Sequence, residues 1–197
     1  MVKALIGIPS EKIEFKFLSE FDLVRVATEM DGNCLFHAIA KAYFKPYIMG
    51  KVGEGVFDRS EFVRNLRKDL ALALPAAYSK LANGELTEIA KTMPKYSLKN
   101  LQKELDSNSA VSNYFNEFIS DQLNIDIYIL DAKTKDVYMT ATDLKLLYKN
   151  RKSVIILYLP GHYELIGLLH NSSNVETYFS PTHPLIKKIR ARIDSKL

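Results

Sequence analysis

The chain has 197 residues, of which 47% are hydrophobic and 25% are charged, as expected for a folded globular protein of one domain. The formal net charge of +4 is too small to indicate a nucleic-acid binder. The single cysteine, Cys34, excludes an internal disulfide framework. With no clustered histidines there is no zinc-binding pattern either, and a free thiol fits a reducing compartment inside a cell.

No segment of the sequence is typical of a membrane span or a targeting signal. The longest apolar run, Val154 to Pro160, is only long enough for a strand. The first 12 residues contain a short apolar run without the layout of a signal peptide. We therefore expect no membrane span. The free thiol leads us to expect an intracellular protein in a reducing compartment, which is the cytoplasm.

The first quarter of the chain predicts extended segments, a turn and a helix. Residues 12–18 alternate apolar with charged side chains, which predicts a half-buried strand, and residues 23–26 continue in extended form. A polar triplet, 31–33, then leads into a helix that Cys34 opens. The apolar positions of this helix have helical spacing: Leu35, Ala38, Ile39, Ala42 and Tyr43. Residues 45–57 contain Pro46 and three glycines and predict a loop, whose apolar residues suit recognition and local packing equally well.

The middle of the chain predicts helices. The first spans 58–74, with Asp58 or Ser60 as its N-cap, and Pro75 either ends it or begins the next turn. Shorter helices are expected over 76–82, closed by Asn83-Gly84, and over 97–107. A broad apolar stripe then predicts a helix over 110–123 that packs on the core.

The last third predicts strands and one more helix. Strands are expected over 125–130, 137–140, 153–159 and 162–169, with a Pro160-Gly161 turn between the last two. Residues 185–197 predict an amphipathic helix with isoleucines on one face and basic residues elsewhere. Such a helix either binds membranes and acidic partners or packs its isoleucines on the domain, and we favour packing. Helices and strands segregate along the chain, so the predicted fold class is α+β.

Cys34 is the one residue that suggests a nucleophile. A lone cysteine is often only a small buried hydrophobic residue. At a helix N-terminus, however, the helix dipole favours a thiolate. The preceding loop can aim backbone N–H groups at an oxyanion, and the candidate donors are Asp31, Gly32, Asn33 and Cys34. The sequence therefore predicts a cysteine hydrolase, provided that a base lies nearby.

His162 is the best candidate for that base. His37 sits three residues after Cys34 on the same helix and suits a structural or surface role. His170 ends a strand, where exposure is expected, and His183 lies at a helix start. His162 begins a strand, and Glu164 shares its face because strand side chains alternate with a period of two, so this carboxylate can orient the imidazole. The alternative is a strand edge that faces water.

Two motifs in this order resemble the ovarian tumour (OTU) family of cysteine proteases, which are deubiquitinases. Asp31-Gly32-Asn33-Cys34-Leu35-Phe36 is similar to the family's D-G-N-C-hydrophobic-aromatic signature. Gly161-His162-Tyr163 is similar to its late histidine followed by an aromatic residue. The resemblance covers roughly residues 20–170. Small members of the family occur in viruses, and this compact chain is similar to those. If the chain is viral, the reducing compartment is the host cytoplasm.

The resemblance implies a papain-like α+β fold of the OTU type, with a small central sheet packed between helical regions. It implies one catalytic domain over 1–197, with a core at about 20–170 and a C-terminal extension from 171 that carries the basic helix. By match, Cys34 is the nucleophile and His162 the general base and acid.

The same match leaves the acid behind His162 open. The family usually has Asp or Asn where this chain has Glu164. The longer side chain leaves open whether Glu164 orients His162, or whether Asp31 serves as an active-site acid or shapes the oxyanion loop. Tyr163 is expected to wall the channel for the Gly-Gly tail of ubiquitin.

The implied partner is ubiquitin, polyubiquitin or a ubiquitin-like modifier, and the implied reaction is hydrolysis of the bond after its C-terminal glycine through a Cys34 acyl-enzyme. No metal, cofactor or nucleic acid is expected, and a monomer is expected. The second interpretation is a ubiquitin-binding module with weak or lost activity. It is supported by Glu164, which stands where the family usually has Asp or Asn. A basic module for nucleic acid or membranes is a third class, supported only by the C-terminal helix and the net charge.

Overall fold

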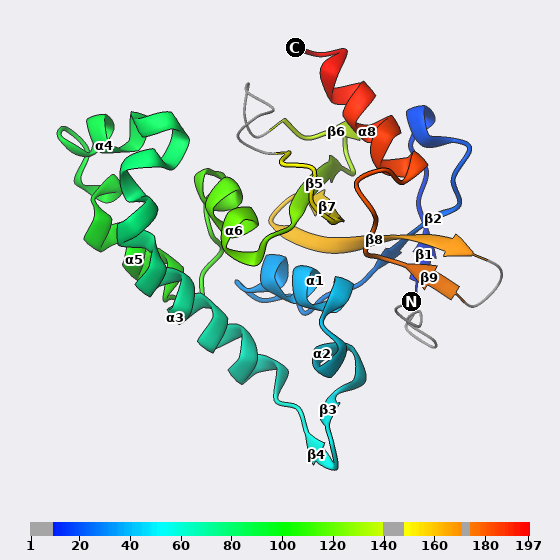
Figure 1. Ribbon diagram of the computed structural model, residues 1–197, viewed down its shortest axis with the longest axis horizontal. Coiled ribbons are helices and arrows are strands. Elements are labelled where there is room, and N and C mark those ends of the chain that lie inside the picture. The colour runs from blue at the N-terminus through cyan, green and yellow to red at the C-terminus, as the bar shows by residue number, and fades with distance from the viewer. Residues whose placement is uncertain (1–9, 140–147, 171–173) are drawn as a thin grey trace.

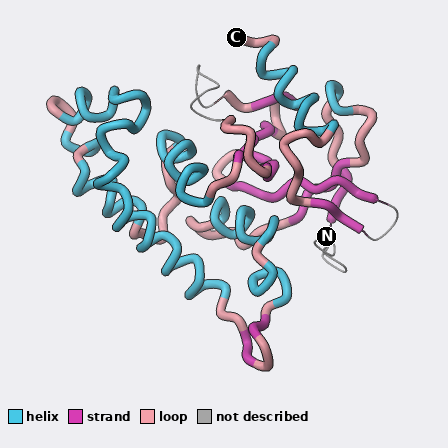
Figure 2. The backbone as a smooth tube through the Cα atoms, in the orientation of Figure 1, coloured by secondary structure: helices cyan, strands magenta, loops and turns pink. Residues whose placement is uncertain are grey.

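The computed structural model describes residues 10–139, 148–170 and 174–197 (Figures 1 and 2). Its elements in chain order are β1 (Ser10–Lys12), η1 (Lys16–Leu18), β2 (Leu23–Val26), α1 (Cys34–Tyr43), α2 (Lys45–Met49), β3 (Lys51–Val52), β4 (Gly55–Val56), α3 (Arg59–Ala77), η2 (Tyr78–Gly84), α4 (Glu85–Ala90), η3 (Pro94–Tyr96), α5 (Leu98–Leu105), η4 (Asn113–Phe115), α6 (Asn116–Leu123), β5 (Asp126–Asp131), β6 (Asp136–Val137), β7 (Ser153–Leu159), β8 (His162–His170), β9 (Asn174–Glu176) and α8 (Pro184–Asp194).

The central sheet has the strand order β1-β2-β8-β7-β5-β6, and β9 also pairs with β8. β5 and β7 are parallel, whereas the other pairs in this sheet are antiparallel. The predicted Pro160-Gly161 turn joins β7 to β8, and Gly161 has a φ of 76°, a conformation that favours glycine. β8 thus lies between β2 and β7, and its first residue is His162.

Alternating side chains give the sheet a separate core on each face. Ile127, Val154 and Leu165 belong to one core, which α1, α3, α5 and α6 complete. Tyr128, Ile155 and Ile166 belong to the other, which the N-terminal segment and α8 complete. Figure 1 shows the sheet between α1 and α8, with α3, α4 and α5 extending to one side as a helical arm. This arrangement confirms the predicted α+β fold with a sheet between helical regions.

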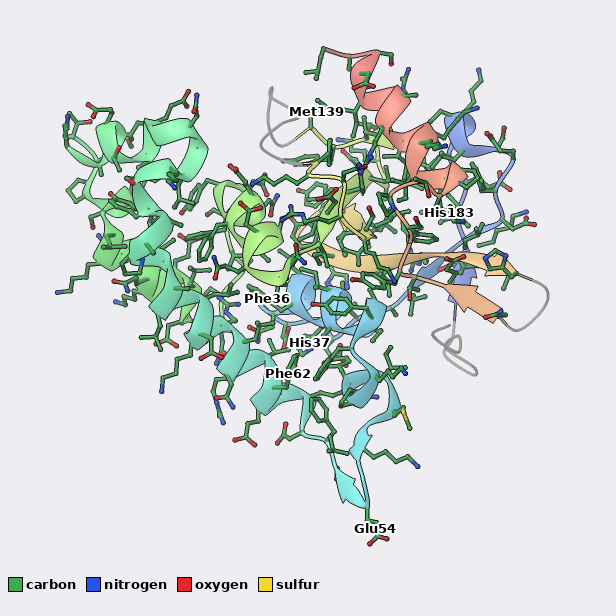
Figure 3. The ribbon with its side chains drawn as sticks, viewed as in Figure 1. Phe36, His37, Glu54, Phe62, Met139 and His183 are labelled. Atoms are coloured by element: carbon green, nitrogen blue, oxygen red, sulfur yellow. The ribbon has the colours of Figure 1, made fainter. Side chains whose placement is uncertain are left out.

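Two segments expected to be a strand and a loop are folded differently. Only Ser10–Lys12 is a strand in the first region; the 3₁₀ turn at Lys16–Leu18 places Phe15 and Leu18 together in the core, because residues three apart share a side of such a turn. Residues 45–57 form α2 and the β3–β4 hairpin instead of a loop. Pro46 sits in the first turn of α2, where its missing N–H costs nothing, and Figure 3 shows Glu54 at the hairpin tip.

The helical boundaries also differ from the predictions. Asp58 is the N-cap of α3, as one of the two alternatives proposed. Pro75 does not end this helix, which continues to Ala77, and the carbonyl of Ala71 that Pro75 cannot engage accepts a 2.9 Å hydrogen bond from the Gln102 side chain. The helix expected over 110–123 begins only at Asn116, the segment expected over 76–82 is a distorted 3₁₀ helix, and α4 and β9 were missed.

The strands of the last third follow the predictions closely. β5, β7 and β8 lie within one residue of the expected boundaries, and β5 and β7 are buried on both faces for most of their length. The short strand expected over 137–140 is observed as Asp136–Val137, and Thr140 lies outside the described residues.

The C-terminal helix packs on the domain, as favoured from its pattern. Its isoleucines Ile186, Ile189 and Ile193 are buried. Its charges are largely matched within the chain: Lys188 pairs with Glu20, Arg190 with Asp126, and both Arg192 and Lys196 with Asp136. The helix therefore packs its apolar face on the domain and directs these charges toward acidic partners of the same chain. No helix in the described part of the chain is long and apolar enough to cross a membrane.

Candidate functional site

Cys34 is the first residue of α1, which packs against β8 beneath the sheet (Figure 1). Its side chain is only 3% exposed. Burial raises the pKa of the Cys34 thiol, and the charge of Asp31 acts in the same direction. The backbone N–H groups of Tyr163 and Leu35 act to lower that pKa but do not outweigh burial. The helix N-terminus therefore does not by itself produce a resting thiolate, contrary to the expectation from the sequence.

The contact with the Tyr163 backbone brings the thiol to the first residues of β8, where His162 precedes Tyr163 in the strand. The imidazole is half-buried, and its Nε2 lies 3.4 Å from the hydroxyl oxygen of Thr28. Among the described residues no hydrogen bond joins His162 to Cys34.

Thr28 is a site residue that the sequence prediction missed. It follows β2, which pairs with β8. Its hydroxyl donates a 2.5 Å hydrogen bond to the carbonyl of Tyr163, so its oxygen is free to accept from His162 Nε2. The side chain is nearly buried. Only the pairing of two strands distant in sequence places this threonine behind the imidazole, and no local pattern marks it.

Glu164 lies on the same strand as His162, as predicted, but at a longer distance than a hydrogen bond. Its Oε1 is 3.8 Å from His162 Nε2, and its Oε2 is 3.4 Å from Nε of Arg25 on β2. The carboxylate is buried, and Oε2 has no hydrogen-bond partner in the described structure. The Glu164 carboxyl group therefore lies near both the Arg25 guanidinium and the His162 ring, while the hydroxyl of Thr28 is the closer polar group to the ring.

Asp31 has no hydrogen bond or ion pair with His162 in the described structure, and its own contacts hold the loop before Cys34. Its Oδ1 accepts a 2.8 Å hydrogen bond from the backbone N–H of Asn33, and its Oδ2 lies 3.3 Å from His37 Nε2. Burial acts to raise the pKa of Asp31, but the hydrogen bonds from Asn33 and the nearby His37 prevail and lower it. Asp31 thus shapes the loop, which is one of the two roles left open for it.

His37 is buried and has a structural position. Its Nδ1 lies 2.6 Å from the hydroxyl of Tyr47, and Figure 3 shows the ring on the α2 side of α1. Because Asp31 contacts Nε2 of the same ring, the imidazole joins the 31–33 loop to α2. The structural alternative for His37 is confirmed, and the surface alternative is wrong.

The four expected oxyanion donors are mostly engaged within the loop. The N–H of Asp31 donates to Glu29, that of Asn33 to the Asp31 side chain, and that of Cys34 to the Asp31 carbonyl over 3.3 Å. Gly32 alone has no N–H acceptor among the described contacts. An oxyanion would therefore have to displace the long Cys34 bond or use Gly32, and the oxyanion role of this loop stays a prediction.

Gly32 is required by close packing. A Cβ at this position would lie 1.9 Å from the carbonyl oxygen of Asn108. The loop after α5 thus presses directly on the nucleophile loop, a contact that no local pattern in the sequence indicates.

Tyr163 points away from His162, because consecutive strand residues face opposite sides. Its hydroxyl donates to Asn113 Oδ1 over 3.3 Å, and its ring lies 5.5 Å from that of Tyr158. Burial raises the pKa of Tyr163 to about 12. The phenol is therefore neutral and half-buried beside Cys34, and its role as a channel wall stays a prediction.

The site is built from side chains and backbone of α1, β2 and β8. In the described part of the chain, no group of three or more histidine, cysteine or acidic side chains is arranged to hold a metal ion.

No protein-family model and no curated protein matches the sequence. Solved structures do resemble the fold. A structure of an ovarian tumour (OTU) domain in complex with ubiquitin aligns with a TM-score of 0.59 at 18% identity, covering 92% of this chain and 88% of that one. The OTU of Hazara virus bound to ubiquitin aligns at 0.49 and 17% identity, covering 84% and 98%. The viral OTU protease of Dera Ghazi Khan virus aligns at 0.49 and 14%, with the same coverage.

Proposed function

The chain has the fold of an OTU domain, and on that premise we propose that it is a cysteine-type deubiquitinase. It hydrolyses the peptide or isopeptide bond after the C-terminal glycine of ubiquitin or a ubiquitin-like modifier. The observation that carries the proposal is the placement of Cys34, the only cysteine, at the N-terminus of α1 against the backbone of Tyr163. His162 is the neighbouring residue at the start of the same strand.

In the proposed reaction Cys34 gives its proton to His162 as the sulfur attacks the glycine carbonyl. The imidazolium then protonates the leaving amine, and the acyl-enzyme forms. Water, activated by the neutral imidazole, attacks the thioester and releases the glycine carboxylate and the thiol. Attack requires the ring and the sulfur to reach hydrogen-bond distance, and such contacts often tighten only when substrate binds.

The proposed roles around His162 follow from its contacts. Thr28 accepts from Nε2 and fixes the ring orientation, while Glu164 stabilises the imidazolium by charge. The raised pKa of Cys34 fits this scheme because a neutral resting thiol needs a base that acts during the attack. Such a thiol must also stay unoxidised, so we propose a reducing compartment, the cytoplasm, as the site of action.

A second candidate function is a ubiquitin-binding module with weak or no activity. It is favoured by the buried thiol, by the lack of a Cys34–His162 hydrogen bond among the described residues, and by the engaged loop donors. Both candidates predict ubiquitin binding, but only the enzyme forms a covalent bond with it.

The test is to incubate the protein with ubiquitin carrying a C-terminal electrophile, in parallel with ubiquitin-like modifiers carrying the same group. The enzyme is expected to form an adduct on Cys34, and Cys34→Ala is expected to abolish both the adduct and cleavage of a fluorogenic ubiquitin amide. Binding without an adduct would favour the second candidate. Cleavage by Cys34→Ala would show that the nucleophile is assigned wrongly.

The roles of the supporting residues are separable in the same assay. Thr28→Val keeps the shape of the side chain but removes the hydroxyl, and Glu164→Gln keeps the size but removes the charge. Each is expected to slow turnover about 10-fold or more, as expected for loss of ring orientation or of imidazolium stabilisation. Full activity in Thr28→Val would exclude the hydroxyl as the orienting group.

A further inference from the structure

Arg67 is a buried cation in the middle of α3, and its side chain is only 1% exposed. No carboxylate hydrogen-bonds to it among the described residues. Its acceptors are three backbone carbonyls and one side-chain amide oxygen. The face of the guanidinium lies over the ring of Phe36, with Cζ 4.9 Å from the ring centre. The charges of Asp31, Glu104 and Asp106 also favour the buried cation, but its hydrogen bonds go to neutral acceptors, whose positions the rigid guanidinium fork fixes.

One arm of the guanidinium holds the loop before Cys34. Its NH1 donates to the carbonyl of Gly32 over 3.2 Å and to Oδ1 of Asn33 over 2.8 Å. The peptide between these residues is planar and trans, so its C=O and N–H point in opposite directions. Holding the Gly32 carbonyl therefore also keeps the Asn33 N–H directed at Asp31 Oδ1, which fixes the peptide plane one residue before Cys34.

The other arm holds the end of α5. Nε donates to the carbonyl of Leu105 over 2.7 Å, and NH2 to that of Glu104 over 2.9 Å. The last carbonyls of a helix lack partners within the helix and favour a positive charge. A single side chain thus connects the helical arm of the molecule to the nucleophile loop.

We propose that Arg67 is a positioning residue for the reaction of Cys34: it keeps the 31–33 loop in the orientation from which the sulfur attacks and the N–H groups of Gly32 and Cys34 reach the oxyanion. The inference rests on the proposed function. A merely structural arginine would stabilise the domain without changing the reactivity of each folded molecule.

The variants are chosen to separate these two roles. Arg67→Lys keeps the charge but cannot span acceptors on both sides. Asn33→Ala removes the side-chain acceptor on the loop and leaves the α5 contacts in place, so it tests the loop arm even if Arg67→Lys does not fold. Arg64→Lys is the matched control, because Arg64 lies on the same helix and is 67% exposed.

Each variant is measured at a temperature where it is folded, with two ubiquitin probes. A C-terminal aldehyde forms a hemithioacetal whose oxygen needs the oxyanion donors, whereas a C-terminal propargyl group reacts without a carbonyl oxyanion. Ubiquitin affinity is measured separately in the Cys34→Ala background.

We expect Arg67→Lys to lower kcat/KM about 10- to 100-fold, the range for a displacement of about 1 Å. Aldehyde binding should fall more than the propargyl rate, and ubiquitin affinity should stay within threefold. Asn33→Ala should show the same ratio, and adding it to Arg67→Lys should cause little further loss. Arg64→Lys should match the wild type.

Three outcomes would overturn the inference. The first is an equal loss of reaction with both probes, and the second is a loss confined to ubiquitin affinity. The third is an unchanged kcat/KM in Asn33→Ala and in any folded Arg67→Lys. A wild-type protein that reacts with no ubiquitin or modifier probe would refute the proposed function and this inference with it. An active wild type with unaffected variants refutes the inference alone.

Discussion

Replacing Gly32 by Ala tests whether the packing around the nucleophile loop controls reactivity. The added Cβ would meet the Asn108 carbonyl oxygen at 1.9 Å and two further backbone atoms, Asn108 C and Ser109 Cα, at 2.7 Å each. A Cβ contact below 3.0 Å essentially never occurs, so the two loops must separate by at least about 1.1 Å. The φ of Gly32 is not in the left-handed region, so the cost is steric and not conformational.

The loop after α5 has little freedom to retreat. The backbone N–H of Ser112 donates to the Glu104 side chain over 2.8 Å, and Arg67 holds the carbonyls of Glu104 and Leu105. Arg67 also holds Gly32 and Asn33, so both loops are restrained and the segment that carries Cys34 must take part of the displacement. Overpacking of this kind costs about 1–3 kcal/mol of unfolding free energy. For a chain of this length each kcal/mol lowers Tm by roughly 2–4 °C. A shift of about 1 Å at a catalytic group can cost about 10²-fold in rate.

The assay compares Tm and the kcat/KM for a fluorogenic ubiquitin amide in Gly32→Ala and in Gly55→Ala. Gly55 lies on the β3–β4 hairpin, and its nearest neighbour to an added Cβ is at 3.5 Å, so this control should behave like the wild type. A Gly32→Ala protein with unchanged Tm and with kcat/KM within threefold of the wild type would refute the reasoning.

Three further predictions concern the thiol, an ion pair and the C-terminal helix. Burial raises the pKa of Cys34, so in His162→Ala the rate of alkylation by iodoacetamide should rise with pH, with a midpoint above the ordinary thiol value of about 8.5. A midpoint below about 8 would show that the helix N-terminus outweighs burial. Arg192 and then Lys196 hold the pKa of Asp136 below its unfolded value, so its stabilisation is present above about pH 4 and is lost as the pH falls. Asp136→Asn should therefore lower the unfolding free energy by about 0.5–1 kcal/mol in urea at pH 7 and by less at pH 2, and a difference as large at pH 2 as at pH 7 would contradict this. Ile189 is fully buried, so Ile189→Ala should lower the free energy of urea unfolding by about 2–5 kcal/mol with little change in kcat/KM. Lys187 is exposed, so Lys187→Ala should leave the unfolding free energy almost unchanged. Equal effects of the two substitutions would mean that α8 is not packed as described.

The residues whose structure depends on near neighbours in the chain were predictable. Val154 to Leu157 form a strand buried on both faces because every residue of the run is apolar and β-branched or aliphatic. Asp58 caps α3 through the N–H three residues ahead, and Cys34 opens α1 after a polar turn. The motif around Cys34 and the one around His162 also indicated the fold that the comparison with a solved OTU domain shows.

What the sequence could not decide depends on groups far apart along the chain. Pro75 looked like a helix end, but Gln102 satisfies the carbonyl that the proline leaves free, so the helix continues. The thiol of Cys34 looked activated by its helix, but burial under the sheet reverses the balance. Neither effect is visible within one turn of the residue concerned.

By itself, the sequence determined the α+β class, the strands around His162 and the candidate pair of Cys34 and His162, because periodicity, caps and turns act over a few residues. Only the tertiary structure decided which groups surround that pair. Thr28 reaches His162 across 134 positions of the chain, and Arg67 reaches the Gly32 carbonyl across 35. Such contacts arise from strand pairing and helix packing. The strength of each hydrogen bond depends on how deeply it is buried and on acceptors that come from distant parts of the chain, so no local sequence pattern specifies it.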